Sequence, residues 1–179
     1  MPAPELLDTP LWAFSLKVYG GDGVADECLD LQERLKLDVN LLLFAAFAGA
    51  VEGVQLDPPD IAGANAAIAG WHDEIGRALR AARRALKPAG SDTGNPLRGP
   101  SAALRAQVKA AELEAEKIEQ AMLWQWSRAQ LPGRPRSGRD QALAANLRGV
   151  LEFYGATAGA DKTAPRLFDA AAAYAQSIR

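Results

Sequence analysis

The sequence predicts an all-α protein, a bundle of about five main helices followed by a C-terminal helical pair. Apolar residues recur at intervals of three and four along most of the chain, which is the period of one helical face. Proline, glycine and aspartate stand where these periodic stretches start and stop. The 179 residues are 49% hydrophobic and 23% charged, as in an ordinary globular unit. The expected helices span residues 10–19, 23–36, 39–52, 60–87, 101–130, 140–154 and 165–178.

The first two helices are separated by a glycine-rich turn. Thr9 followed by Pro10 suits an N-cap and first helical position, because proline loses no intrahelical hydrogen bond there. Three glycines then end the first helix, and Asp22 is placed to cap the second. Cys28, the only cysteine, falls on the apolar stripe of the second helix. A lone thiol in that position is expected to be a small buried hydrophobic residue, without a disulfide partner.

The third expected helix carries no charged residue from Val39 to Val51. Leu37 and Asp38 precede it and suit a hydrophobic staple and an N-cap, whose carboxylate accepts hydrogen bonds from exposed amides. The run is about 13 residues long, whereas about 20 are needed to cross a membrane. We therefore expect a central core helix and no membrane insertion. The N-terminus has neither a basic start nor an apolar signal core, so we expect a cytoplasmic protein.

The fourth expected helix, residues 60–87, has the clearest periodicity and an apolar stripe that continues from Ile61 to Leu86. Five cations lie beside the stripe near the C-terminal end of the helix: Arg77, Arg80, Arg83, Arg84 and Lys87. Such a row is usually a solvated face that complements the helix dipole. The alternative is a site for an anion or an acidic partner.

The fifth expected helix, residues 101–130, follows a loop of turn-forming residues and has Ser101 as its predicted cap. Its apolar residues occupy more than one side, so the helix is expected to be sandwiched between layers. A further line at spacings of four and three is charged: Arg105, Lys109, Glu112, Glu116 and Glu119.

Two roles can be weighed for the glutamates of that line. Carboxylates in a bundle core bind metal in ferritin-like proteins, but those sites need Glu-x-x-His elements. His72 is the only histidine and has no glutamate three residues before it. We therefore expect no metal and no cofactor, and interpret His72 as a hydrogen-bonded packing residue. If helices 60–87 and 101–130 are antiparallel neighbours, the basic row should instead pair with the glutamates.

Several short sequence motifs in this chain resemble those of a known family. They are F-S-L-x-V-Y, G-V-x-x-x-C-L-x-L-Q and D-V-N-L-L-L-F, in that order, with further similarity at residues 80–87 and 108–120. Over roughly residues 11–124 the chain resembles a small bacterial family of helical proteins of unknown function, DUF2390. The resemblance implies an all-helical domain of bacterial type and offers no catalytic residues.

The resemblance ends before the last third of the chain, which we interpret as an addition to the bundle. Residues 1–130 are expected to form the helical core, and residues 131–179 a linker and a C-terminal helical extension packed on it. The linker contains Arg134, Arg136 and Arg139. Nucleic-acid binding through them is not expected, because no aromatic residues are interleaved and the chain has a net charge of −2.

The charge distribution is strongly asymmetric. Through Glu74 there are 13 acidic and 3 basic residues, and from Ile75 onward 9 acidic and 17 basic residues. The two parts are expected to pack together and form surface ion pairs, each worth about 0–1 kcal/mol. Alternatively, one of them attracts a partner of opposite charge.

These features favour a non-enzymatic interaction or adaptor module that docks a protein partner or a second copy. The alternative is a helical protein that binds or transforms a small anionic, partly apolar ligand. Dinucleotide, Walker, nucleophile-elbow and C-x-x-C motifs are absent, so no catalytic residue is assigned. The candidates for holding an anion or partner are Arg80, Arg83, Arg84, Arg105 and Lys109, and the polar candidates are His72, Glu112 and Glu116. A polar cavity would favour the ligand, and an exposed apolar patch the partner.

Overall fold

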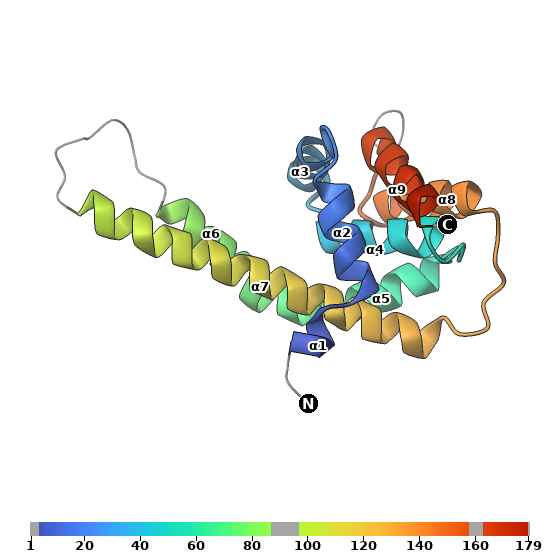
Figure 1. Cartoon of the computed structure of the whole chain (residues 1–179), viewed down its shortest axis with the longest axis horizontal. Coiled ribbons are helices and arrows are strands. Elements are labelled where there is room, and N and C mark those ends of the chain that lie inside the picture. Colours follow the sequence, from blue (N-terminus) through green and yellow to red (C-terminus); the bar gives the residue numbers. More distant parts are fainter. Residues whose placement is uncertain (1–3, 87–96, 158–162, 179) are drawn as a thin grey trace.

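The structure, a computed structural model, describes residues 4–86, 97–157 and 163–178. Within them the chain is helical and contains no strand, which confirms the predicted fold class (Figure 1). The elements are α1 (Pro4–Leu7), α2 (Pro10–Tyr19), α3 (Val24–Leu35), α4 (Val39–Ala50), α5 (Pro58–Trp71), the π-helical turn η1 (His72–Gly76), α6 (Arg77–Ala85), α7 (Arg98–Gln130), α8 (Arg139–Phe153) and α9 (Pro165–Ser177).

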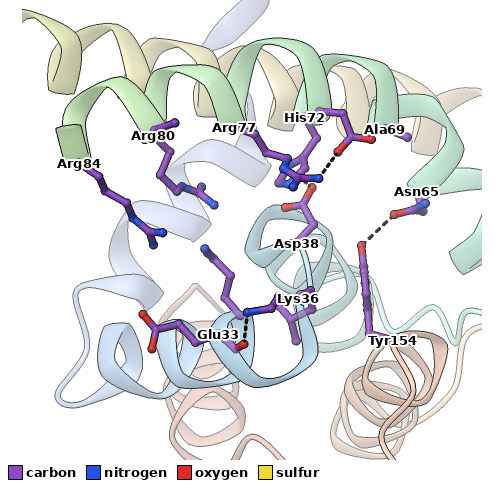
Figure 2. A pocket seen from close by; sticks show the side chains of 14 residues that line it. Glu33, Lys36, Asp38, Asn65, Ala69, His72, Arg77, Arg80, Arg84 and Tyr154 are labelled. Carbon is purple, nitrogen blue, oxygen red and sulfur yellow. Dashed lines mark hydrogen bonds and ion pairs between the residues drawn. The ribbon is translucent and has the colours of Figure 1, made fainter.

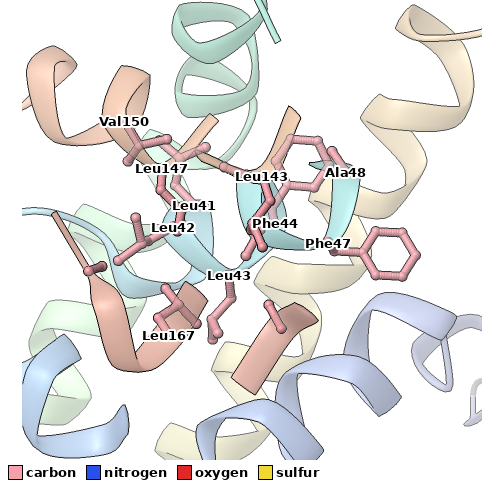
Figure 3. Close-up of a cluster of buried hydrophobic side chains, with 14 of the residues drawn as sticks. Leu41, Leu42, Leu43, Phe44, Phe47, Ala48, Leu143, Leu147, Val150 and Leu167 are labelled. Atoms are coloured by element: carbon pink, nitrogen blue, oxygen red, sulfur yellow. The ribbon is translucent and has the colours of Figure 1, made fainter. Parts of the chain in front are cut away.

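Helix α4 is the centre of the core, as its lack of charge predicts. Every residue from Asn40 to Ala50 is buried, so this helix is enclosed on all sides (Figure 3). Phe44 and Phe47 extend from it towards α7, where they meet Trp126 and Trp124 edge to face with ring centroids 6.0 and 5.9 Å apart. Such aromatic pairs add about 0.5–1.5 kcal/mol each beyond the area they bury.

The last third of the chain shares this core. Leu143, Leu147 and Val150 of α8 and Leu167 of α9 belong to the same cluster of buried side chains as α4 (Figure 3). Helix α8 is the main neighbour of α4. The division of the chain at residue 130 remains a prediction, but α8 and α9 supply part of the central core.

Most predicted helix limits agree with the structure to within a few residues, and two predicted caps are wrong. Thr9 caps α2 as predicted, because its hydroxyl accepts a hydrogen bond from the Trp12 amide at 3.1 Å. Asp22 does not cap α3; Gly23, with φ of 70°, occupies that position and makes no side-chain cap. Helix α7 begins at Arg98, so Ser101 lies inside its first turn instead of capping it.

The predicted helix at residues 60–87 is not one continuous α-helix. It comprises α5, the π-turn η1 and α6, and in the turn the Arg77 amide donates to the His72 carbonyl. A π-turn accommodates one extra residue, so the faces of the helix before and after it are out of register. The predicted apolar stripe accordingly fails: Ile61 and Ile68 are buried, whereas Ile75 is 38% exposed. Lys87, which ended the basic row, lies outside the described residues.

Helix α6 and the first half of α7 project from the rest of the molecule as two adjacent helices (Figure 1). We call residues 77–86 and 97–111 the arm. None of these residues is buried, whereas α7 contains buried residues from Glu112 onward. The prediction that helix 101–130 is sandwiched between layers is therefore wrong for its first half, where Leu104 is 49% exposed.

Candidate functional site

Three polar side chains meet where α4, the π-turn and α7 come together. His72 Nδ1 lies 2.9 Å from Asp38 Oδ2 and 3.4 Å from Glu119 Oε1. Asp38 and Glu119 are 5% and 2% exposed, and the His72 side chain 20%. We call these three residues the His72 cluster. It places two buried carboxyl groups against one nitrogen of the only histidine in the chain.

Asp38 has two functions at this position. Its Oδ1 accepts a hydrogen bond from the Asn40 amide at 2.8 Å, which caps α4 as predicted, and its Oδ2 faces His72. A cap residue is held in one orientation by the helix that it starts. The carboxylate is therefore fixed relative to the most buried helix in the protein.

His72 is positioned by the π-turn that it begins. Such turns occur mostly as single interruptions of α-helices, and often at functional sites. Next to it, the Trp71 indole donates to the Ala115 carbonyl of α7 at 3.0 Å. The buried Gly76 closes the turn beside Glu119, so that a Cβ added there would lie 3.8 Å from Glu119 Oε2. Helix α7 and the π-turn are thus in close contact along the cluster.

The protonation of the cluster follows from its burial and its pairing. Burial disfavours charge on Asp38, but hydrogen bonds with His72 and Glu119 outweigh this and lower the pKa of Asp38. The hydrogen bonds of His72 to Asp38 and Glu119 raise the pKa of the imidazole to about 10. Burial raises the pKa of Glu119 to about 8. At neutral pH the cluster therefore holds a carboxylate, an imidazolium and a carboxylic acid.

A pocket of about 890 Å³ opens beside the cluster, and Asp38 and His72 form part of its wall (Figure 2). Three arginines of α6 lie on one side, and residues from the end of α3 lie opposite (Figure 2). Tyr154 and Asn65 lie at the other end, where the tyrosine hydroxyl donates to Asn65 Oδ1 at 2.9 Å. The rest of the wall includes Glu33, Lys36, Leu37, Ala69, Asp73, Arg77, Arg80, Ala81 and Arg84.

The predicted pairing of the basic row with the glutamates is confirmed for Arg80. Its guanidinium lies 3.4 Å from Glu112 and 3.7 Å from Glu116. Arg83 also forms an ion pair and hydrogen bonds with Glu112. These two arginines, both candidates for binding an anion, are thus engaged within the protein.

The other predicted candidates do not converge on one site. Arg77, a member of the basic row outside the five candidates, pairs with Asp73 of the π-turn at 3.2 Å. Arg84 lines the pocket and makes no ion pair or hydrogen bond with any described residue. Arg105 and Lys109 lie on the arm outside the pocket wall, and Arg105 Nε is buried without a hydrogen-bond partner among the described residues. Of the five basic candidates, only Arg80 and Arg84 line the pocket.

The sequence did not identify Asp38 and Glu119 as site residues. The signals were present but separate, because Asp38 was recognised as a cap, and Glu119 as the end of a charged line whose role in binding metal was considered and rejected. Only the packing of α4, the π-turn and α7 brings them to His72. Within the described part of the chain, these three residues are the group of donors close enough to hold one metal ion, with ligand atoms all within 4.8 Å of one another.

The comparison with protein families finds a match that covers much of the chain. The family described as "Protein of unknown function (DUF2390)" matches residues 10–123, which is more than half of the chain. The chain belongs to the DUF2390 family. Asp38, His72 and Glu119 all lie in the part that matches DUF2390, whereas Tyr154 lies beyond it. Neither the comparison with curated proteins nor that with solved structures finds a match to this chain.

The described helices were also compared with the length and hydropathy of membrane spans. None of them is both long and apolar enough to cross a bilayer. The uncharged helix α4 owes its composition to burial within the protein.

Proposed function

We propose that this protein binds a small anionic, partly apolar ligand in the pocket beside the His72 cluster. Of the two functions that the sequence suggested, this is the one that a polar cavity favours. The observation that supports it most directly is Arg84, an exposed guanidinium on the pocket wall that has no partner among the described residues.

The charge of the wall favours an anion. Arg77 and Arg80 are compensated by Asp73, Glu112 and Glu116. The charge of Arg84 is not compensated by any described residue. Lys36 lies on the opposite side, where its ammonium donates to the Glu33 carbonyl at 2.7 Å (Figure 2). A guanidinium donates two parallel hydrogen bonds to a carboxylate or a phosphate, which makes such groups the natural occupants.

The remaining wall favours a ligand with an apolar part. Leu37, Ala69 and Ala81 contribute apolar surface, and Tyr154 contributes an aromatic ring with a hydroxyl. Burial raises the pKa of Tyr154 to about 12, so its hydroxyl stays protonated, and its single proton is the one that Asn65 Oδ1 accepts. Apolar walls with a few fixed polar groups are typical of small-molecule sites.

Thermal shift and calorimetric titration test this proposal with two probes that share a ring, phenyl phosphate and benzoate, and with neutral phenol as a control. We expect one or both anions, but not phenol, to raise the melting temperature. Arg84→Ala should abolish the shift, whereas Lys109→Ala, which removes a cation of the arm outside the pocket, should retain it. Absence of a shift with both anions, or a shift that persists in Arg84→Ala, would contradict the proposal.

The arm supports a second candidate function, that of an interaction module. Its described residues carry seven cations and no acid, and Leu97 and Leu104 are 68% and 49% exposed. Helix α3 presents the exposed acids Asp26, Asp30 and Glu33. The arm of one molecule therefore complements α3 of a second copy in charge, which steers association.

Sedimentation velocity at low and high salt tests this association. We expect self-association at low salt that is lost when Arg98, Arg105 and Lys109 are changed to glutamate. A copy with Asp26 and Glu33 changed to lysine should restore association with that variant; Asp30 is left unchanged because it pairs with Arg34. Arg80 and Arg83 are unsuitable for charge reversal, because both pair with Glu112. A monomer at all salt concentrations would exclude the second copy as the partner.

A further inference from the structure

The His72 cluster contains donor atoms in the arrangement that a divalent metal ion requires. A carboxylate oxygen of Asp38, the Nδ1 of His72 and a carboxylate oxygen of Glu119 lie within 4.8 Å of one another. We propose that these three residues bind one divalent transition-metal ion, with its remaining coordination positions open towards the pocket. The inference is independent of the anion proposed above.

The spacing of the donors fits such an ion. Ligands of a tetrahedral zinc ion at about 2.0–2.2 Å lie about 3.3 Å from one another. His72 Nδ1 lies 2.9 Å from the Asp38 oxygen and 3.4 Å from the Glu119 oxygen. The oxygens of Asp38 and Glu119 lie within 4.8 Å of each other, so an ion between the three atoms would need shifts of side chains that already meet at one nitrogen.

The charges of the three ligands also suit a divalent ion. In the metal-free cluster at neutral pH the imidazolium balances Asp38, and Glu119 is protonated. A bound metal ion would displace both protons, which leaves a neutral imidazole and two carboxylates that are almost completely buried. Buried charge is costly unless it is compensated, and one divalent ion compensates both groups. The nearest cations do not oppose this, because Arg77 and Arg80 are paired with acidic side chains.

Two of the three ligands are held in place by the surrounding backbone. Asp38 is held by its hydrogen bond to the start of α4, and His72 by the turn that follows Trp71. Metal sites with three protein ligands and an open position are typical of catalytic and ligand-binding zinc. The open position exists here because Asp38 and His72 also line the pocket. One imidazole and two carboxylates suit zinc, manganese or iron better than copper(I).

A metal ion at the His72 cluster differs from the expectation of no metal that was drawn from the sequence. That expectation depended on the absence of a glutamate three residues before His72, whereas the carboxylates come from α7 and from the residue before α4. Sequence spacing within one helix could not reveal a ligand set that is assembled from three segments.

Calorimetric titration of the tag-free protein with Zn²⁺, followed by measurement of the metal content after dialysis, tests the site. His72 is the only histidine and Cys28 is buried, so few competing ligands exist. We expect one Zn²⁺ per chain. Asp38→Asn preserves the cap of α4, because asparagine caps as well as aspartate, and should weaken binding at least about tenfold.

Glu119→Gln should weaken binding similarly, and His72→Gln, which changes a half-buried residue, should abolish it. Glu116→Gln is the matched control, since it removes a carboxylate from the same helix outside the cluster, and should bind like the wild type. Absorption of the Co²⁺-loaded protein reports the coordination and does not depend on any variant folding. If no metal binds, or if all variants bind equally, the cluster is a hydrogen-bonded ion group only and the proposal is wrong.

Discussion

Gly49 of α4 packs directly against the backbone of Leu143 of α8. A Cβ added at Gly49 would lie 2.5 Å from both the amide nitrogen and the Cα of Leu143, closer than any real contact of this type. Backbone has no freedom to rotate away, so the absence of a side chain at Gly49 sets the distance between the two central helices.

Gly49→Ala should therefore destabilise the protein by about 1–3 kcal/mol or more through overpacking. Gly70 of α5 provides the matched control, because nothing lies within 4 Å of an added Cβ there. Gly70→Ala should stabilise the protein by about 0.5–1 kcal/mol, since alanine favours the helix. Urea denaturation measures both, and the same sign for the two variants would contradict this account.

Asn146 should be one of the most sensitive polar residues of the core. It is fully buried, accepts from the Leu56 amide at 2.8 Å, and donates to the carbonyls of Ala45 and Val54 at 3.1 and 2.9 Å. Asn146→Ala leaves these backbone groups unpaired and should cost about 2–4 kcal/mol. The exposed Gln141→Ala on the same helix should change the free energy of unfolding by less than about 0.5 kcal/mol.

Asp38→Ala should lower the free energy of unfolding by about 0.5–2 kcal/mol through the lost N-cap. The loss should be larger than that of the cap alone, because the substitution also removes the partner of His72. Asp38→Asn should retain most of the capping contribution. The difference between the two variants in urea midpoint measures the cap. An unchanged midpoint for Asp38→Ala would show that the α4 terminus finds another acceptor.

Glu112 should contribute to the loss of stability in acid. Burial opposes its ionisation, but hydrogen bonds and charges from Arg83 and Arg80 outweigh this and lower the pKa of Glu112 below its value of 4.5 in the unfolded chain. A lowered folded pKa gives stability that is complete above the unfolded pKa and lost as the pH falls through the folded one. Glu112→Gln should therefore flatten the decline of the melting temperature below about pH 4.5. Parallel pH profiles would refute this.

Cys28 should be unreactive in the folded protein. Burial, assisted by the charge of Glu27, raises the pKa of the Cys28 thiol to about 12, and the thiolate is the reactive form. Labelling with a thiol reagent at mildly alkaline pH should be slow in buffer and reach one group per chain in urea. Rapid labelling in buffer would mean that α3 opens readily.

The sequence predicts the fold well where helical period and caps agree. Helix α2 has the predicted limits, and Thr9 and Asp38 cap as expected, because both features depend on neighbours in sequence. The π-turn was not predictable from the period, since the spacing of apolar residues continues through it.

The site was predicted less completely, for a related reason. Arg80 and Glu112 were predicted to meet because each belongs to a regular row on one of two adjacent helices. Asp38 belongs to no row, and its second oxygen is directed towards His72 by tertiary packing alone. Residues whose role depends on the junction of several elements leave no periodic trace in the sequence.

The pocket lies between two helices that differ in burial, α6 of the arm and the core helix α4. Every residue from Asn40 to Ala50 of α4 is buried, whereas α6 has no buried residue, so we expect amide hydrogens of α6 to exchange through local opening at a lower free energy than those of α4. Arg80 and Arg84 belong to α6, whereas Asp38 is the N-cap of α4. A ligand that requires Arg84 binds only the molecules in which α6 is folded against α7, so its apparent affinity is scaled by that fraction. Binding would in turn slow amide exchange along α6 while leaving α4 unchanged.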